Sequence, residues 1–211
     1  MQYEDDTALA GLNSAQREAV STDASRVLVL AGAGSGKTRV LVQRMIWQAT
    51  RGIPLSKMLA VTFTNKAAGE IRTRIEAQLG MSSRGCWYGT FHGLAHRMLR
   101  LHWKEANLPE SFQVIDTDDQ QRIIKRLIRE LRLDEKKYPY RKIAQRINAC
   151  KDDGLQGALA EERLSDRYLG AQIKIYQAYE ALCQQAGLVD FAELLLRAWS
   201  LLNNHPALLE H

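Results

Sequence analysis

The stretch Ala31-Gly32-Ala33-Gly34-Ser35-Gly36-Lys37-Thr38 decides the fold of this chain. An apolar run, Val27 to Leu30, precedes it, and apolar residues at helical spacing follow it from Val40 onward. A strand, a glycine-rich loop and a helix in this order are typical of a P-loop, whose backbone N–H groups surround phosphate oxygens. Glycine is needed because a Cβ atom would obstruct the close approach of phosphate to the backbone. The sequence therefore predicts a nucleotide-binding site.

The residue types at the end of this stretch suit the chemistry of a bound nucleotide. Lys37 supplies positive charge to the β- and γ-phosphates, and the hydroxyl of Thr38 can join the coordination shell of Mg²⁺. The following helix directs its positive N-terminal end at the same anion. One departure is that Ala31 stands where the G-x-x-x-x-G-K-[ST] pattern has its first glycine. The alternative interpretation is a glycine-rich turn with a surface lysine.

Length and composition predict a sizeable hydrophobic core and a cytoplasmic location. The chain has 211 residues, 45% of them hydrophobic, and a formal net charge of +5, which is compatible with a polyanionic partner without requiring one. Its three cysteines show no metal-ligand spacing, so we expect them to stay reduced. The acidic start does not resemble a signal peptide, and no apolar run reaches membrane-spanning length.

Strands and helices alternate after the P-loop. The predicted elements are a strand at 59–63, a helix at 64–79, a short strand at 86–88 and a helix at 89–103. Such alternation indicates a parallel α/β sheet, whose ligands gather at the carboxyl ends of the strands. We therefore expect the P-loop, residues 62–65 and residues 89–92 to share one edge.

A short helix is predicted ahead of the P-loop, from Leu12 to Val20. Asn13 is placed to cap it, and Gln16 follows three residues later, as in a capping box. That structural role is favoured for Gln16 when the segment is considered alone. A glutamine also carries the donor and acceptor needed to read an adenine edge. Both interpretations stay open.

Beyond Thr90 the strand signal almost vanishes and helices dominate. The expected helices start near Asp116, span Pro139 to Cys150, end at Gly187, and start again after Asp190 as an N-cap. Between Arg122 and Lys151 there are eleven Lys or Arg residues against three acids. A solvated helix face is one interpretation of this basic run, and a surface that binds duplex DNA backbone through counterion release is the other.

Several of these segments together resemble superfamily 1 DNA helicases of the UvrD/Rep/PcrA group. Residues 12–20 are similar to the adenine-reading Q motif, and residues 31–38 to Walker A with its alanine start. Residues 61–68 resemble motif Ia, and residues 89–93 the following DNA-contacting motif. Residues 187–195, Gly-Leu-Val-Asp-Phe-Ala-Glu-Leu-Leu, add to the likeness. A small-molecule kinase, the alternative enzyme class, would leave residues 62–65 and 90–92 unexplained.

The resemblance implies roles for individual residues. Gln16 would read adenine and Arg39 would stack on it, while residues 31–38 hold ATP and Thr38 holds Mg²⁺. Phe63 would stack on a base of single-stranded DNA, which suits sequence-independent binding because every base has a π-face. Asn65, Thr90 and His92 would bind phosphates or sugars nearby. A core position for Phe63, a helix-start position for His92 and a solvated Arg39 are the structural alternatives.

The resemblance also implies an architecture and a function. We expect a P-loop NTPase (RecA-like) parallel sheet that is incomplete, followed by a mainly α-helical subdomain. Residues 1–89 would be the first segment of domain 1A, and residues 90–211 subdomain 1B. The parent protein would be an ATP-dependent 3′–5′ helicase in DNA repair and replication, acting on single strands and on junctions with duplex.

The family's D-E-x-Q-D motif, which supplies the acid for Mg²⁺ and positions water, does not occur in the 211 residues. The chain alone is therefore expected to bind nucleotide and single strands without turnover. An incomplete sheet would expose apolar surface, so self-association is a further expectation.

Overall fold

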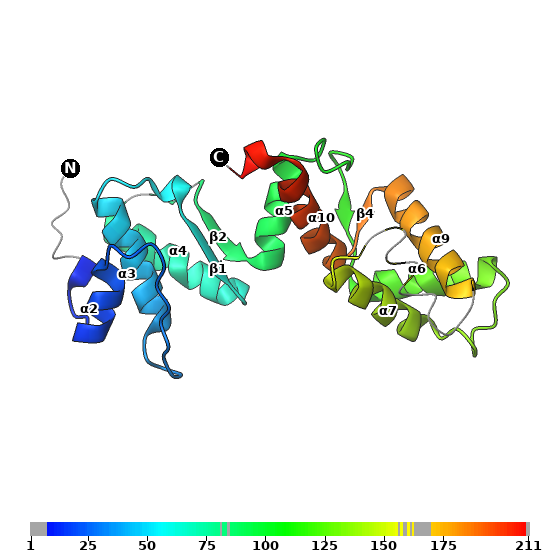
Figure 1. Cartoon of the computed structure of the whole chain (residues 1–211), viewed down its shortest axis with the longest axis horizontal. Helices are drawn as coiled ribbons and strands as arrows, with labels where there is room; N and C mark the ends of the chain where they lie inside the picture. The colour runs from blue at the N-terminus through cyan, green and yellow to red at the C-terminus, as the bar shows by residue number, and fades with distance from the viewer. Residues whose placement is uncertain are drawn as a thin grey trace. The chain divides into compact units, whose positions relative to one another are not determined.

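The computed structural model describes residues 8–80, 82–83, 85–155, 157, 160, 162 and 170–209. The chain divides into two compact units, Met1–Leu94 and Ala95–His211. Their boundary falls within helix α5 (Phe91–Leu101), which is labelled in Figure 1. The two units are described separately below as the N-terminal unit and the helical unit.

The N-terminal unit is built on two parallel strands and the helices that cover them. Its elements are α2 (Ser14–Ser21), α3 (Lys37–Thr50), η1 (Leu55–Lys57), β1 (Leu59–Thr62), α4 (Asn65–Leu79) and β2 (Trp87–Thr90). β1 pairs with β2 in a register that places Leu59 beside Trp87 and Thr62 beside Thr90. Buried residues of α3, α4 and β1 form one core, which includes Ile46, Ile71 and Ala60.

Local signals in the sequence account for where these helices begin and end. The side chain of Asn13 caps α2, and the reciprocal bond from Gln16 completes the predicted capping box. The Thr64 side chain accepts from the N–H of Ala67 at the start of α4, and Gly80 ends α4 with a left-handed φ of 62°. The predicted capping box and the predicted end of α4 are confirmed.

The strand predicted at Val27–Leu30 is wrong. Residues 26–32 are without regular secondary structure, and the side chains of Leu28 and Leu30 are 83% and 86% exposed. A strand exists only where a neighbour takes its backbone hydrogen bonds, and in the described part of the N-terminal unit β1 and β2 pair only with each other. The segment therefore reaches the P-loop without regular secondary structure. The third predicted strand is confirmed as β2, although it begins one residue later than expected.

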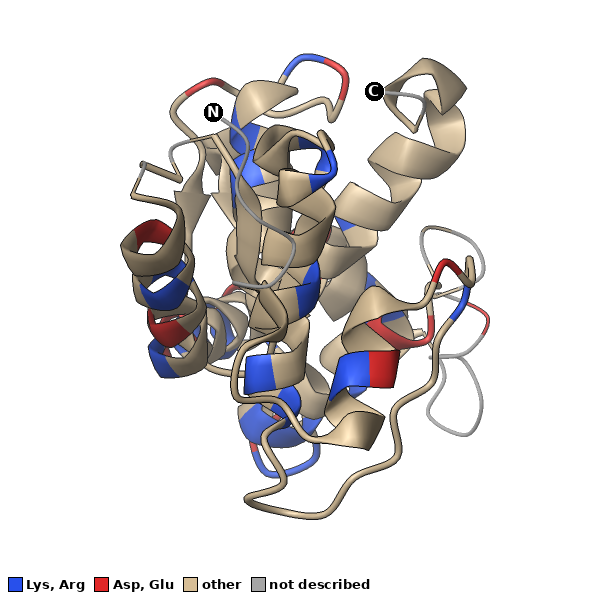
Figure 2. Ribbon diagram, turned by 90° about the vertical axis from the view of Figure 1, so that its left-hand side faces the viewer, with Lys and Arg blue, Asp and Glu red and all other residues tan. Residues whose placement is uncertain are grey.

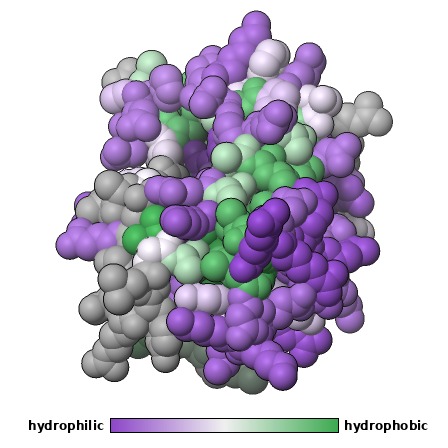
Figure 3. Space-filling model, turned by 90° about the vertical axis from the view of Figure 1, so that its right-hand side faces the viewer, coloured by the Kyte–Doolittle hydropathy of each residue, from purple (hydrophilic) through white to green (hydrophobic). Residues whose placement is uncertain are grey.

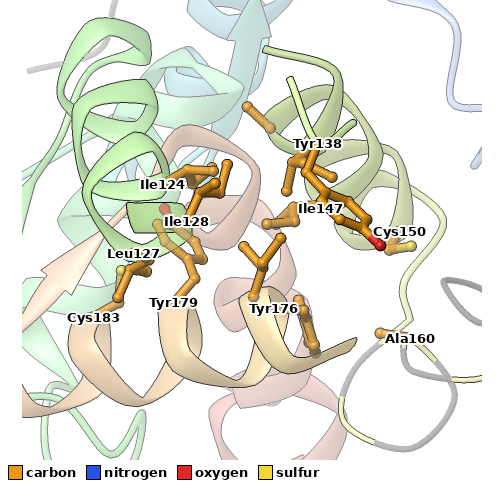
Figure 4. Close-up of a cluster of buried hydrophobic side chains, with 13 residues drawn as sticks. Ile124, Leu127, Ile128, Tyr138, Ile147, Cys150, Ala160, Tyr176, Tyr179 and Cys183 are labelled. Carbon is orange, nitrogen blue, oxygen red and sulfur yellow. The ribbon is translucent and has the colours of Figure 1, made fainter. Parts of the chain in front are cut away.

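The helical unit has four long helices, of which the first three surround its main core and the fourth contributes to a second core. These are α6 (Thr117–Glu130), α7 (Tyr140–Asp152), α9 (Ala171–Ala186) and α10 (Phe191–Asn204), followed by η2 (Pro206–Leu208). Figure 4 shows Ile124 and Ile128 of α6 facing Ile147 of α7 and Tyr179 of α9. The surface in the view of Figure 3 is largely hydrophilic, with hydrophobic side chains gathered near its centre. The helices α6, α7 and α9 bury the apolar faces that their spacing predicts, whereas Trp199 of α10 stays 59% exposed.

A short parallel pair of strands, not predicted from the sequence, joins distant parts of the helical unit. β3 (Gln113–Val114) pairs with β4 (Leu188–Val189). Two residues are too few to show the period of a strand, so the pattern gave no signal. A second core, which contains Leu99, Phe112, Val189 and Leu201, surrounds this pair. None of the described helices is long and apolar enough to span a membrane.

Candidate functional site

The glycine-rich loop curls over the start of α3. Gly34 and Gly36 adopt left-handed φ angles of 74° and 87°, which glycine reaches without the strain that a Cβ atom brings. Lys37 is the first residue of α3, and its Nζ donates to the carbonyl oxygens of Ala31 at 2.9 Å and Gly32 at 2.6 Å. The ammonium group therefore lies inside the curve of the loop, where it would meet an anion.

The donors of this loop fit a phosphate group. Among the described residues, none accepts a hydrogen bond from the N–H groups of Gly36, Lys37 or Thr38. These donors stand at the N-terminus of a 14-residue helix, whose dipole favours negative charge there. Thr38 is half-buried on the first turn, and no group of three acidic, His or Cys side chains that could hold a metal by itself occurs in the described residues. Its hydroxyl therefore fits Mg²⁺ only as one ligand beside phosphate oxygens.

Gln16 and Arg39 both approach the phosphate-binding loop. The Nε2 of Gln16 donates to the carbonyl of Ser35 at 3.0 Å, while its Oε1 accepts from the N–H of Asn13. A Cβ atom on Gly36 would lie 3.0 Å from Gln16 Nε2 and 3.9 Å from Arg39 Cβ. Both interpretations of Gln16 are thus compatible, because its capping bond and its contact with the loop coexist.

Two exposed phenyl rings stand beyond the carboxyl ends of β1 and β2. Phe63 is 92% exposed and Phe91 is 54% exposed, and their ring centroids are 6.3 Å apart with planes tilted by 57°. The parallel register that pairs Thr62 with Thr90 brings them to the same edge. A core position for Phe63 is excluded by its exposure, and exposed aromatic faces suit stacking on bases. Phe91 was not among the predicted site residues, although it lies within residues 89–92, which were expected at this edge.

Polar groups surround this aromatic pair. Asn65 is exposed at the first position of α4, and His92 is half-buried on the first turn of α5. The Oγ1 of Thr90 accepts from the N–H of Gly93 at 3.1 Å, which leaves the hydroxyl proton available to an acceptor. The structure therefore brings Phe63, Asn65, Thr90 and His92 to one sheet edge, while residues 26–32 reach the P-loop outside the sheet.

The helical unit contains a buried ionic cluster around Lys151, whose side chain is 2% exposed. Its Nζ lies 2.8 Å from Asp190 Oδ2 and 2.9 Å from both Glu180 Oε1 and Glu193 Oε2. Burial by itself lowers the pKa of Lys151, but Glu193, Asp190 and Glu180 together raise it well above its usual value. Burial acts to raise the pKa of Asp190, but the charge and hydrogen bond of Lys151, with hydrogen bonds from the N–H of Glu193 and the hydroxyl of Tyr179, outweigh burial, so that pKa is lowered.

Asp190 is the centre of this cluster. Besides Lys151, its Oδ2 accepts from the hydroxyl of Tyr179 at 2.7 Å and from Gln120 Nε2 at 3.2 Å. Its Oδ1 accepts from the N–H of Glu193, which confirms the predicted N-cap of α10. Lys151 was counted with the basic run, and this assignment to a surface was wrong because Lys151 is enclosed by α7, α9 and α10.

The rest of the basic run is largely exposed and partly neutralised. Arg122 pairs with Asp119 at 2.5 Å, Arg126 with Glu130 at 3.4 Å, and Arg129 with Glu135 at 2.6 Å. Figure 2, in which the N-terminal unit faces the viewer, shows Lys and Arg with Asp and Glu among them on the helices of that unit as well. Exposed pairs of this kind contribute about 0–1 kcal/mol each to stability, so they leave the side chains free to exchange partners.

The left-handed glycines, the lysine inside the loop and the helix behind it define a P-loop protein. The chain belongs to the UvrD/REP helicase family, since the family model described as UvrD/REP helicase N-terminal domain matches residues 12–211. This confirms the resemblance to the UvrD/Rep/PcrA group.

Individual relatives agree with the family match. DNA helicase II of Salmonella typhimurium is 53% identical over 205 residues, and DNA helicase II of Escherichia coli is 52% identical over 204 residues. The ATP-dependent DNA helicase PcrA of Bacillus subtilis is 34% identical over 211 residues. These matches cover 96–100% of this chain but only 28–29% of the relatives. The chain therefore corresponds to less than a third of their length.

Proposed function

We propose that this chain is the ATP- and single-stranded-DNA-binding part of an ATP-dependent 3′–5′ DNA helicase that acts in repair and replication, and hence in the cytoplasm. The observation that carries the proposal is the bond from Gln16 Nε2 to the carbonyl of Ser35. It joins the candidate base-reading residue to the phosphate loop, so one bound nucleotide can contact both. The family match to DNA helicases supplies the motor function.

Nucleotide binding would use the loop for the phosphates and the neighbouring side chains of Gln16 and Arg39 for the base. The N–H groups of residues 31–38 and the ammonium of Lys37 hold the phosphates, and the hydroxyl of Thr38 holds Mg²⁺. When bound, Mg²⁺ neutralises charge that develops on the phosphates. Gln16 would present one donor and one acceptor to the adenine edge, and Arg39 would lie over its face.

Single-stranded DNA would bind beyond the carboxyl ends of β1 and β2, where the two exposed phenyl rings stand. Phe63 stacks on a base, and Asn65, Thr90 and His92 contact phosphates or sugars next to it. Because stacking uses only the face of a base, the site accepts any sequence. Such tolerance is what a motor that moves along a strand requires.

We further propose that residues 1–89 are the first segment of domain 1A and residues 90–211 are subdomain 1B. The exposed side chains of Leu28 and Leu30 support an incomplete sheet, because the apolar run at 27–30 has the composition of a strand that is buried on both faces. Further strands of the parent helicase would cover them. Self-association of the isolated chain through this segment is the alternative way of burying it.

The isolated 211 residues would bind ATP without hydrolysing it. Hydrolysis requires an acid for Mg²⁺ and a group that positions water, and the D-E-x-Q-D sequence that supplies both in this family is not among the 211 residues.

The exposed part of the basic run supports a second candidate function, contact with the backbone of duplex DNA. Its members that form no surface ion pair described above include Lys136, Lys137, Arg141 and Lys142. Their contribution would fall steeply with salt, because binding releases condensed counterions.

The test is equilibrium binding of MgATP to this chain and to Lys37→Ala, with hydrolysis followed in the presence and absence of a single-stranded oligonucleotide. We expect Lys37→Ala to bind at least tenfold more weakly, and no turnover in either condition. Lys174→Ala, which removes an exposed lysine of α9, is the matched control. Equal binding by Lys37→Ala would refute the assignment of the site, and DNA-stimulated turnover would refute the inference that the chain alone is inactive.

A further inference from the structure

Arg44 of α3 reaches across to the end of α2. Its Nη1 donates to three carbonyl oxygens, those of Ala19 at 3.1 Å, Val20 at 3.1 Å and Thr22 at 3.2 Å. The residue is half-buried. It lies two helical turns beyond Lys37, so the same helix that begins at the phosphate loop also holds α2.

Helix α2 needs support from outside itself. It has eight residues, fewer than an isolated helix requires for stability in water, and its last turn contains no basic residue. The carbonyl groups at a helix C-terminus lack partners and carry partial negative charge. The guanidinium of Arg44 satisfies three of these oxygens with one positive charge. The buried side chain of Val20 packs beside Val40 of α3 and completes the attachment.

This attachment determines where the amide of Gln16 lies. Gln16 is one turn before Val20, and its two bonds run to Asn13 and to Ser35 of the phosphate loop. An amide oxygen has two lone pairs and an amide nitrogen two hydrogens, so one acceptor and one donor remain. The two bonds fix the direction of this remaining acceptor and donor of the Gln16 amide as long as α2 stays packed against α3.

We propose that Arg44 is a positioning residue for base recognition: it holds α2 against α3 so that the amide of Gln16 faces the nucleotide bound by the loop. This inference rests on the proposed function. Arg44 touches neither the loop nor Gln16, so its loss acts on the base and leaves the phosphate contacts intact. Nucleotides that differ only in the base therefore report on Arg44, whereas inorganic tripolyphosphate does not.

The experiment measures the affinities of the full 211-residue chain for MgATP, MgGTP and inorganic tripolyphosphate. We expect Arg44→Met, which keeps the length of the side chain, to lower ATP affinity by about tenfold, equivalent to about 1.4 kcal/mol. GTP and tripolyphosphate affinities change by less than about twofold, which is under about 0.4 kcal/mol. Arg44→Lys keeps the charge and recovers part of the ATP preference. Hydrogen exchange of the amides of residues 17–22 becomes faster in Arg44→Met.

Arg51→Met is the matched control. Arg51 is the C-cap residue of α3 and pairs with Asp23 at 2.7 Å, but the two side chains are 48% and 82% exposed. We expect its ATP preference to equal that of the wild type. If Arg44→Met does not fold, the graded loss in Arg44→Lys decides the question.

Three results would overturn the inference. One is a wild-type ratio of ATP to GTP affinity in both Arg44 variants. Another is an equal loss of ATP and tripolyphosphate binding in Arg44→Met, which would show a general effect on the site. The third is a wild-type chain that binds tripolyphosphate but does not prefer ATP to GTP. The variant Lys37→Ala distinguishes these results from a failure of the proposed function. If the loop were not the phosphate site, Lys37→Ala would bind tripolyphosphate as tightly as the wild type.

Discussion

Replacing Lys151 by methionine removes the positive charge from the buried cluster of the helical unit. Methionine fills a similar volume, so the change leaves the packing and deletes the charge. Three carboxylates stay behind, of which Asp190 and Glu193 are 4% and 7% exposed. Glu193 keeps Arg197, whose Nε lies 2.7 Å from its Oε1. The variant therefore leaves Asp190 as the main buried charge without a cation.

The expected loss of stability is large. Removing one partner of a buried ion pair costs about 3–5 kcal/mol, and the retained Arg197 places this case near the lower figure. With a urea slope of about 1–3 kcal/mol per molar, the unfolding midpoint falls by on the order of 2 M. Such a loss is a substantial part of the roughly 5–15 kcal/mol that stabilises a domain.

Urea unfolding at pH 7, followed by circular dichroism, measures the loss. Hydrogen exchange of amides in α7 and α9 assigns it to the helical unit. Lys174→Met, at an exposed position of α9, is the matched control and should change stability by less than about 0.5 kcal/mol. A loss below about 1 kcal/mol in Lys151→Met, far under the cost of an uncompensated buried charge, would refute the assignment of Lys151 as the ion that stabilises this cluster.

The remaining predictions concern pH, the loop and the DNA edge. Because the pKa of Asp190 is lowered in the folded state, its stabilisation is fully present above the usual carboxyl pKa of about 3.9 and is lost as pH falls from there through the lowered folded-state pKa. Urea midpoints of the wild type and Asp190→Asn should therefore differ at pH 7 and approach each other as pH falls through that range; a constant difference would contradict this. Gly36→Ala, with positive φ and a Cβ 3.0 Å from Gln16 Nε2, should lose about 1–2 kcal/mol of stability and also ATP affinity. Gly52→Ala, which has positive φ and open space around it, should lose stability alone in the same two assays. Phe63→Ala and Phe91→Ala should each weaken oligonucleotide binding in fluorescence anisotropy by about 1–3 kcal/mol, and unchanged affinity in both would remove the aromatic site.

Features coded by neighbouring residues were predictable from the sequence. The N-caps at Asn13 and Asp190 and the helix that follows the P-loop are confirmed, because caps and amphipathic spacing act over three or four residues. The aromatic edge was partly predictable, since strand ends locate Phe63 but the exposure of Phe91 depends on how β1 and β2 align.

Features that depend on distant residues were not predictable. The strand expected at 27–30 has the right composition, yet strand formation depends on a neighbouring strand that local sequence does not describe. Lys151 looks like any other member of the basic run, and its burial is decided by Glu180, Asp190 and Glu193 from two later helices. Arg44 likewise gave no signal, because its acceptors are carbonyl groups at the end of another helix.

The β3–β4 pair has a topological consequence. Gln113 lies beside Leu188, so the polypeptide leaves for the long helices and comes back at nearly the same point. The chain between the two strands thus begins and ends at one strand pair, which is called the neck here. Lengthening or shortening a surface loop between β3 and β4 changes the closure entropy only slowly with loop length and does not move the two strands of the neck apart. A larger protein can therefore carry such a unit as a side branch, and evolution can reshape the branch without disturbing the main chain that bears it.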